Sequence, residues 1–392
     1  MAGRAAGAGS LSSLREANRS LVVETVRRYG GLTQIELAEA TGLSTATVST
    51  LVRELLAAGL VETSTTTRSG RRAQLVTIAK QVGLAIGVQI GHRLLRVALV
   101  DFAYDVVAEQ TLPLPPEHRV DTCLDRAALL AVDLLEQVGS SLDDVVAIGV
   151  GVPAPVDSST GMVSVRGIMR GWDEVHLAHV LNKRLGRPVY VDNDANLGAL
   201  AESVLGAAKE FRDSIFVRAS HGVGAGIVIS GRVHRGFAGT AGEIGHVQVD
   251  PAGDICRCGS RGCLDTIVGA QALLAPLRAN LGNVALRDVI QLATEGDPGC
   301  QQVIADAEAQ IGAVVAGLGM AVNPQCIVVG GELAETGEVL LGPLRDAVRR
   351  RVLLNQIAPL EVVPAELGER AEVLGAVLLA IQSSDFSVGG GG

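Results

Sequence analysis

Apolar residues in the first sixty positions recur at intervals of three and four, which is the spacing of amphipathic helices. A first helix is predicted to end at Tyr29-Gly30-Gly31. Its recurring positions are Leu14, Ala17, Leu21, Val22, Thr25 and Val26. Thr33 and Glu36 have the spacing of a capping box, which predicts a second helix ending near Thr41-Gly42. The inward-facing positions of this helix are expected to be Ile35, Leu37 and Ala38.

A third helix is predicted to begin after Ser44, with an apolar stripe on one face and short polar side chains on the other. The stripe consists of Val48, Leu51, Val52 and Leu55. The polar face consists of Thr45, Thr47, Ser49, Thr50 and Arg53. Short polar groups on a helix face suit close approach to base edges and phosphates in the major groove. We therefore expect Ser44 and this polar face to contact DNA.

Two short strands are predicted after Gly59, at residues 60–63 and 75–78, around a polar loop. The loop carries three cations, Arg68, Arg71 and Arg72, which would lie along the phosphate backbone or reach the minor groove. With the three helices, this segment resembles a winged helix-turn-helix DNA-binding head. The alternative that helix spacing leaves open is a three-helix protein-interaction module.

Composition supports a basic head joined to an acidic body. Residues 1–80 hold 10 Lys and Arg against 6 Asp and Glu, whereas the remainder of the 392-residue chain holds 23 against 36. No apolar run reaches the roughly 18 residues of a membrane span. The first ten residues lack the apolar stretch of a signal peptide, so a cytoplasmic location is expected. The final ten residues, 383–392, end in four glycines and are predicted to be a disordered tail.

Cysteine and histidine spacing predicts a metal site. Three of the six cysteines are scattered and are expected to be small buried hydrophobes: Cys123, Cys300 and Cys326. The others cluster after a histidine: His246, Cys256, Cys258 and Cys263. Thiolate and imidazole are ligands of tetrahedral zinc, and four protein ligands leave no position for a hydrolytic water. We expect one structural Zn²⁺ per chain, with a redox cluster or unligated thiols as alternatives.

Two further patterns flank the cysteines. Residues 189–191 are predicted to be a strand that leads through an Asp192-Asn193-Asp194 turn into a helix, and such carboxylates can project into a cleft or simply cap the helix. The run Gly242-Glu243-Ile244-Gly245-His246 precedes the cysteines. With the metal pattern, these segments resemble the ROK family, which groups sugar kinases with sugar-sensing repressors. The resemblance covers almost the whole chain and also includes residues 149–153, 171–172, 222–226 and 328–331.

The resemblance implies an α/β body of two actin-like (ribonuclease H-like) lobes, with sugar bound in the cleft between them. The expected division is a head over residues 1–80, a first lobe over 81–195 and a second lobe over 196–367, with a C-terminal helix over 368–383 packing back on the first lobe.

The family motifs also imply which residues bind sugar. Asp194 matches the residue that is the catalytic base in the kinases and contacts sugar hydroxyls, and Asn193 matches a neighbouring sugar ligand. Glu243 and His246 match the next sugar-contacting motif, with His246 shared between sugar and zinc. Asp265 replaces the glutamate that usually completes the pocket and is one methylene shorter.

The nucleotide end departs from the kinase pattern. Phosphoryl transfer requires the nucleotide phosphates and Mg²⁺ to be held and neutralised. Where the kinases have Asp-x-Gly-Gly-Thr, this chain has Gln89 in place of the acid and His92 in the small-residue loop. His221 crowds the second phosphate loop, which is Gly-Thr-Gly in the kinases. We therefore expect a catalytically inactive body in which Asp194 is a vestigial base, with an active ATP-dependent sugar kinase carrying a DNA-binding head as the alternative.

The resulting hypothesis is a sugar-responsive transcriptional regulator, in the form of a repressor, that binds operator DNA through its head. A homodimer or higher homo-oligomer is expected because winged heads usually read paired half-sites. Sugar can alter DNA affinity only if it favours one conformation of the body, and release of DNA is the expected sign. A scaffold that only binds other proteins is disfavoured by the sugar residues.

Overall fold

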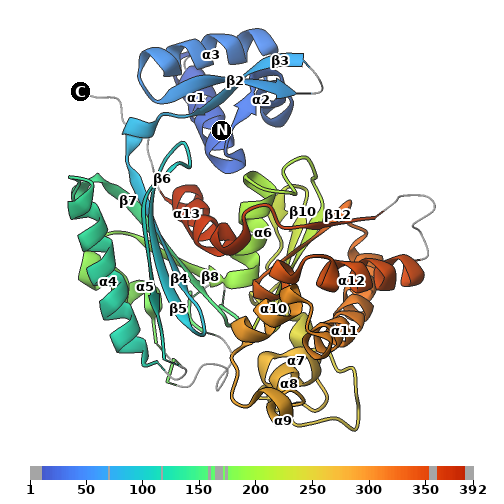
Figure 1. Cartoon of the computed structure of the whole chain (residues 1–392). Coiled ribbons are helices and arrows are strands. Elements are labelled where there is room, and N and C mark those ends of the chain that lie inside the picture. The colour runs from blue at the N-terminus through green and yellow to red at the C-terminus, as the bar shows by residue number, and fades with distance from the viewer. Residues whose placement is uncertain are drawn as a thin grey trace, which may run out of the picture.

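The computed structural model of the protein describes residues 11–68, 71–115, 118–157, 160–163, 171–172, 175–352 and 360–384. Figure 1 shows a small head above a body of two α/β lobes, which lie on either side of the C-terminal helix. Of the predicted disordered tail, residues 385–392 lie outside the described part, whereas Ser383 is the last residue of the C-terminal helix and Ser384 caps it.

The head contains three helices and a three-stranded sheet in the order β1-β3-β2. Its elements are α1 (Leu11–Tyr29), β1 (Leu32–Thr33), α2 (Gln34–Thr41), α3 (Thr45–Ala57), β2 (Val61–Arg68) and β3 (Arg71–Ile78). The predicted caps are confirmed: Thr33 and Glu36 form a capping box, and the Ser44 hydroxyl accepts the Thr47 amide. The apolar stripe of α3 is buried as predicted.

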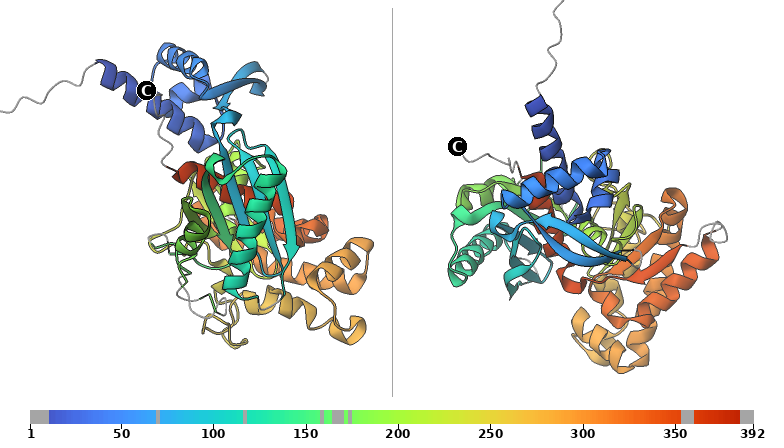
Figure 2. Two further views of the ribbon diagram at one scale, coloured as in Figure 1. Left: turned by 90° about the vertical axis from the view of Figure 1, so that its left-hand side faces the viewer. Right: turned by 90° about the horizontal axis from the view of Figure 1, so that it is seen from above.

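The prediction that Ile35 faces inward is wrong, because its side chain is 66% exposed. Leu14 and Leu21 of α1, which recur at helical spacing, are also exposed, by 59% and 40%. On a helix with 100° between residues, Ile35 points about 160° away from Leu37, so both cannot face one core. Leu37 and Ala38 are buried. Figure 2 shows that the first half of α1 extends outward from the head.

The wing is longer than predicted. Strands β2 and β3 pair from Val61↔Ile78 to Arg68↔Arg71, so most of the predicted polar loop is strand. Residues 63–67 are threonine and serine, and β-branched threonine favours extended backbone. The turn itself, residues 69–70, lies outside the described residues.

The first lobe is built on a sheet in the order β6-β5-β4-β7-β8. Its elements are β4 (Leu84–Ile90), β5 (Leu94–Asp101), β6 (Val106–Pro113), α4 (Val120–Gln137), β7 (Val145–Val152), α5 (Leu177–Leu185) and β8 (Val189–Asn193). Strands β4 to β6 are antiparallel, and β7 and β8 add in parallel. One face packs in a single core with α4 and α5.

The second lobe repeats this strand order as β11-β10-β9-β12-β13. Its strands are β9 (Ser214–Ala219), β10 (Val223–Ile229), β11 (Arg232–Val233), β12 (Cys326–Gly330) and β13 (Glu361–Pro364). Its helices are α7 (Asp265–Val268), α8 (Ala270–Leu274), α9 (Arg278–Leu281), α10 (Leu286–Glu295), α11 (Pro298–Val322) and α12 (Glu338–Arg351). Three antiparallel strands followed by two parallel strands, occurring twice, confirm the predicted two-lobed α/β architecture.

Two helices lie between the sheets: α6 (Asp194–Val204) and α13 (Ala371–Ser383). Glycines bring backbone into direct contact there. A Cβ on Gly149 would lie 1.8 Å from the Ala376 carbonyl oxygen, and a Cβ on Gly375 would lie 2.0 Å from that of Leu197. Helix α13 is therefore fitted closely against β7 on one side and α6 on the other.

Helix α11 is long and apolar enough to cross a membrane by length and composition, with a mean hydropathy of 1.4. This refines the expectation from the sequence that no segment would qualify. In the structure α11 is a core helix of the second lobe, since Ile304, Ile311 and Val315 are fully buried in it.

Candidate functional site

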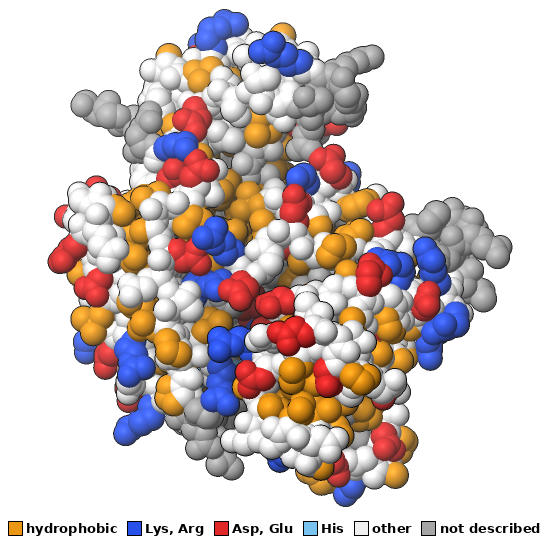
Figure 3. Space-filling model, viewed as in Figure 1, with side chains coloured by type: hydrophobic (Ala, Val, Ile, Leu, Met, Phe, Trp, Pro, Cys, Tyr) orange, Lys and Arg blue, Asp and Glu red, His pale blue; other side chains and the backbone are white. Residues whose placement is uncertain are grey.

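The polar face of α3 lies on the outside of the head, where the sequence placed the DNA contacts. Thr45, Thr50 and Arg53 are exposed, while Thr47 and Ser49 are half-buried. Ser44 is exposed, but its hydroxyl already caps the helix. Figure 3 shows Lys and Arg side chains at the outer end of the head in this view. The accessible part of the predicted face therefore extends over the first three turns of α3.

The arginines predicted for the wing lie at the tip of the β2–β3 hairpin. Arg68 pairs with Arg71 in the strand register, and Arg72 pairs with Thr67. The Arg72 side chain is exposed, whereas the side chains of Arg68 and Arg71 lie outside the described part of the structure. Backbone pairing alone brings the three cations to one end of the hairpin, because facing residues in adjacent strands are neighbours.

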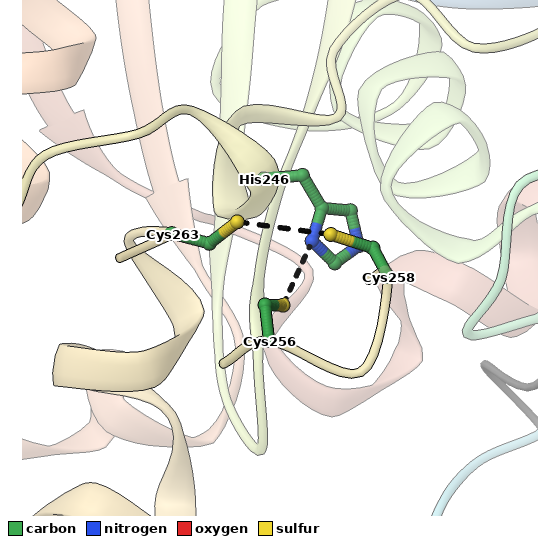
Figure 4. A group of neighbouring side chains, drawn as sticks. All are labelled: His246, Cys256, Cys258 and Cys263. Carbon is green, nitrogen blue, oxygen red and sulfur yellow. Dashed lines mark hydrogen bonds between the residues drawn. The ribbon is translucent and has the colours of Figure 1, made fainter. Parts of the chain in front are cut away.

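The histidine and three cysteines come together at one point of the second lobe, as Figure 4 shows. Their ligand atoms all lie within 4.8 Å of one another, so the group could hold a metal ion. His246 Nδ1 lies 3.5 Å from Cys256 Sγ, and the Sγ atoms of Cys258 and Cys263 are 3.7 Å apart.

The loop that carries the cysteines depends on a tight glycine. Gly262 has φ +64°, and a Cβ there would lie 1.5 Å from the Asp250 carbonyl oxygen. The Gly262 carbonyl in turn accepts the Val249 amide. The other three cysteines are buried and apart from the cluster, as predicted.

Asn193 and Asp194 stand where β8 ends and α6 begins. Helix α6 starts directly at Asp194, so the predicted turn between strand and helix is absent. The Asn193 side chain caps α6 by accepting the amides of Ala195 and Asn196, and its Nδ2 donates to the Ala154 carbonyl. The pKa of Asp194 is raised to about 7, mainly by burial; the charge of Arg218 opposes this shift, and the charge of Glu372 adds to it.

Glu243 and Asp265 lie in the second lobe beside His246. Burial raises the pKa of Glu243 to about 7, and the charges of Asp194 and Asp265 act in the same direction. The Asp265 carboxylate accepts the Val223 amide at 2.9 Å and pairs with Arg257 at 3.2 Å. These electrostatic effects and contacts indicate that the acids predicted to bind sugar share one region.

Sequence reasoning did not identify the buried ionic network behind Asp194. Arg218 of β9 lies 3.2 Å from Asp194 Oδ2 through its Nε, and the same Nε donates to Glu372 Oε1. Glu372 Oε2 accepts from Gln89 of β4. The available signal was a lone arginine inside the otherwise apolar strand β9, where a charge requires a buried partner.

The two loops expected to bind nucleotide phosphates are in contact with each other. The rings of His92, after β4, and His221, before β10, have centroids 5.5 Å apart. His221 Nδ1 lies 3.3 Å from Glu332 Oε1, which also accepts the Ser220 hydroxyl at 2.8 Å. Burial lowers the pKa of His92 to about 3, followed by the positive charges of His221 and Arg218. Side chains of the two lobes therefore meet at the two loops that were predicted to correspond to the phosphate loops of a kinase.

Comparison with known proteins agrees with this division into head and body. The ROK family model matches residues 85–383, and the MarR family model matches residues 17–73. The first match covers both sheets of the body together with α13, and the second covers most of α1, all of α2 and α3, and most of the wing.

The chain is 29% identical over 389 residues to the putative xylose repressor of Caldicellulosiruptor sp. (strain Rt8B.4), a match that covers 95% of this chain and 97% of that protein. It is 31% identical over 380 residues to the N-acetylglucosamine repressor of Escherichia coli O157:H7, with 93% and 92% covered.

Solved structures give the same picture. A ROK family transcriptional regulator, a homolog of the E. coli MLC protein, has a TM-score of 0.73 at 27% identity and covers 93% of this chain and 96% of its own. A ROK family glucokinase from Streptomyces griseus, in complex with glucose and AMPPNP, has a TM-score of 0.69 at 30% identity and covers 77% and 100%. The match to the regulator thus spans a larger share of this chain than the match to the kinase.

Proposed function

This chain belongs to the ROK family and carries a winged-helix head of the MarR type, and we propose that it is a sugar-responsive transcriptional repressor. The head binds operator DNA, and a carbohydrate bound in the body changes the affinity of the head for that DNA. The observation that supports the proposal is a difference between the residues that match sugar ligands and the loops that match phosphate-binding loops. The residues matching sugar ligands are retained near one another, whereas imidazole side chains fill the loops that would hold nucleotide phosphates.

The proposed DNA contacts are the outer face of α3 and the tip of the wing. These residues are Ser44, Thr45, Thr47, Ser49, Thr50, Arg53, Arg68, Arg71 and Arg72. Polar side chains on α3 would read base edges in the major groove, and the wing arginines would neutralise phosphates. The proposed unit is a homodimer or higher homo-oligomer in the cytoplasm, because paired heads can read two half-sites of one operator. We divide each chain into residues 1–80, 81–195 and 196–367, with 368–383 assigned to the first lobe.

The proposed sugar ligands are Asn193, Asp194, Glu243, His246 and Asp265. The Asn193 side chain is held by helix capping, so its role would be to orient Asp194 as well as to offer a hydrogen bond. With Nδ1 of His246 turned toward the cysteines, its Nε2 is left for a sugar hydroxyl. Asp265 already accepts one amide and one guanidinium, which supports an indirect part in holding the loop around the ligand.

The proposed cofactor is one structural Zn²⁺ per chain, held by His246, Cys256, Cys258 and Cys263. Ligands at about 2.3 Å for sulfur and 2.0 Å for nitrogen define a tetrahedron with an S–S edge of about 3.8 Å and an S–N edge of about 3.5 Å. The observed separations of 3.7 Å and 3.5 Å fit these edges. When bound, the ion would link Cys256 and Cys258 to His246 and so couple folding of the loop to the sugar site.

Elemental analysis tests this assignment. We expect one zinc per chain, with lower metal content and weaker sugar binding in Cys258→Ser. The matched control is Cys300→Ala, which removes a buried thiol outside the cluster and should retain the metal. Equal zinc content in Cys258→Ser and the wild-type protein would argue against the site.

We further propose that the body does not transfer phosphate. Gln89 donates to Glu372 and presents no carboxylate to a metal ion, and His92 lies against His221 in the space of the phosphate loops. A coupled assay with ATP and a panel of hexoses and amino sugars should show no sugar-dependent ADP formation. Formation of ADP would favour the alternative, an active sugar kinase with a DNA-binding head.

The central experiment measures DNA binding with and without sugar. An operator is first selected from a random double-stranded DNA library, and its affinity is then titrated with D-xylose, D-glucose, N-acetyl-D-glucosamine and their phosphates. At least one sugar should weaken DNA binding in the wild-type protein. Asp194→Asn should lower affinity for that sugar by about 10- to 100-fold, the loss expected for one or two buried hydrogen bonds. The control Asp306→Asn, on the exposed side of α11, should behave like the wild type.

A further inference from the structure

The C-terminal helix α13 touches the proposed sugar site at its first turn and the DNA-binding head at its end. Glu372, the second residue of α13, accepts from both Arg218 and Gln89, and Arg218 also contacts Asp194. The helix has 13 residues and so extends about 20 Å. It therefore spans from the body site to the head as one element.

The far end of α13 is bonded to the last turn of α1. The Arg27 guanidinium donates to the Ser384 carbonyl just after α13, and Gln382 Nε2 donates to the Arg28 carbonyl at 2.8 Å. Arg27 is only 8% exposed, although it belongs to the head. Tyr104 of the first lobe donates to the Arg27 carbonyl at 3.2 Å and fixes the same turn.

Apolar packing joins the same two helices. Val22, Val23 and Val26 of α1 belong to one buried cluster with residues of α13. The α13 members are Val373, Leu374, Val377, Leu378, Ala380 and Ile381. A shift of α13 would therefore displace packed side chains in the core of the head, as well as the two hydrogen bonds to α1.

A cavity lies between the head and the first lobe, beside the contact between α1 and α13. It has a volume of about 520 Å³ and is lined in part by Glu24 and Arg28 of α1, by Leu379 and Gln382 of α13, and by Tyr190 of β8. The cavity therefore adjoins the contact between the two helices on the side of the first lobe.

We propose that α13 transmits sugar binding at Asp194 to the DNA-binding head, with Arg218 and Glu372 as the positioning residues at its first turn. This rests on the proposed function, since it names the element through which the sugar site regulates the head. Asp194 and Glu372 share one guanidinium in buried surroundings. Sugar hydroxyls that bond to Asp194 compete with Arg218 for its oxygens, so Arg218 shifts toward Glu372 and displaces the helix.

Close packing makes the displacement a movement of the whole helix. The backbone of α13 lies against Gly149 at Ala376 and against Leu197 at Gly375, which leaves no space for a bend in the middle of the helix. Packed elements of this kind shift between discrete arrangements rather than deform continuously.

The test compares Glu372→Gln with the matched control Glu338→Gln in the full chain. Both change a glutamate in the first turn of a helix, but the Glu338 side chain is 73% exposed and pairs only with Arg345 among the described residues. For the sugar that the wild-type protein binds, Glu372→Gln should lose at least about tenfold of the sugar-induced change in DNA affinity measured at saturating sugar. An undiminished sugar effect on DNA binding would overturn the proposal, as would a loss of sugar affinity equal to that of Asp194→Asn.

Amide hydrogen exchange gives a readout that requires neither sugar nor DNA. Glu372→Gln should exchange the amides of residues 22–29 at least about threefold faster than Glu338→Gln, because its α13 is no longer held at the first turn. Unchanged exchange there would overturn the proposal. If no sugar changes the DNA binding of the wild-type protein, the proposed function is contradicted. The amide exchange rates of residues 22–29 then test the link through α13 by themselves.

A milder variant at the other end covers the case in which Glu372→Gln does not fold. Gln382→Ala removes one hydrogen bond to the Arg28 carbonyl. It should leave the sugar Kd unchanged and reduce the DNA response, and a full DNA response would overturn the proposal.

Discussion

Glu308 of α11 is a carboxyl group that the second lobe encloses completely. Its side chain is 0% exposed, and within the described part of the structure neither oxygen has a hydrogen-bond partner. Burial raises the pKa of Glu308 from 4.5 to about 9. Glu308→Gln keeps the shape of the side chain and removes its ionisation, so the variant isolates the free energy of that charge.

The sign follows from the direction of the shift. Because the folded-state pKa is raised above the unfolded value, the folded protein keeps a proton that the unfolded chain releases. This contribution to stability is fully present below pH 4.5 and is lost as the pH rises to about 9. Each pH unit in that window lowers the free energy of unfolding by about 1.4 kcal/mol, so between about pH 6 and 8.5 the wild type should lose about 3 kcal/mol more than Glu308→Gln.

Urea unfolding followed by circular dichroism measures this difference at the two pH values. The quantity compared is the change in the free energy of unfolding between the two pH values. The cost of burying the glutamine amide is the same at both pH values and therefore cancels. Glu338→Gln is the control, since its exposed carboxylate should leave the wild-type slope intact. Stability curves of Glu308→Gln and the wild type that stay parallel within about 1 kcal/mol would refute the reasoning.

Two further predictions concern packing and pH. Gly149→Ala should lower the free energy of unfolding by about 3 kcal/mol in thermal denaturation, because the new Cβ would lie 1.8 Å from the Ala376 carbonyl oxygen and push α13 off β7. Its control, Gly317→Ala, meets nothing within 4 Å in α11 and should be neutral or stabilising by up to about 1 kcal/mol. The pKa of His92 is lowered from 6.5 to about 3, so the contribution of neutral His92 to stability is present above pH 6.5 and is lost as the pH falls. In urea unfolding, His92→Asn should therefore lose about 2 kcal/mol less stability than the wild type between about pH 7 and 5.

Both predictions have clear contrary outcomes. Equal melting temperatures for Gly149→Ala and Gly317→Ala would mean that α13 does not pack tightly on β7. Acid destabilisation of His92→Asn equal to that of the wild type would mean that the imidazole takes up its proton in the folded state as readily as in the unfolded chain.

The local structure of the head could be predicted because its signals act over a few residues. The capping box at Thr33 and Glu36, the cap at Ser44 and the stripe of α3 each depend on neighbours within two helical turns. The orientation of Ile35 could not be predicted in the same way, since exposure depends on which elements pack against the helix. The sequence predicts too short a wing, because its polar run of threonines is typical of a loop. Pairing between β2 and β3 makes the same run a strand.

The metal cluster was also accessible from spacing, because a short loop that holds Cys256, Cys258 and Cys263 can bring its thiols close only in a few ways. The proposed sugar ligands could be predicted only from family motifs, since Asp194, Glu243 and Asp265 are separated by many residues and approach one another only in the folded body.

Local spacing and the chemistry of single residues were enough to predict the capped helices and the cluster of one histidine and three cysteines. Only the tertiary structure decided that Gln89, Asp194, Arg218 and Glu372 form one buried network and that α13 connects this network to Arg27 of the head. The members of that network lie on four elements, up to 283 positions apart, and a charge becomes dependent on a specific partner only once folding removes both from water.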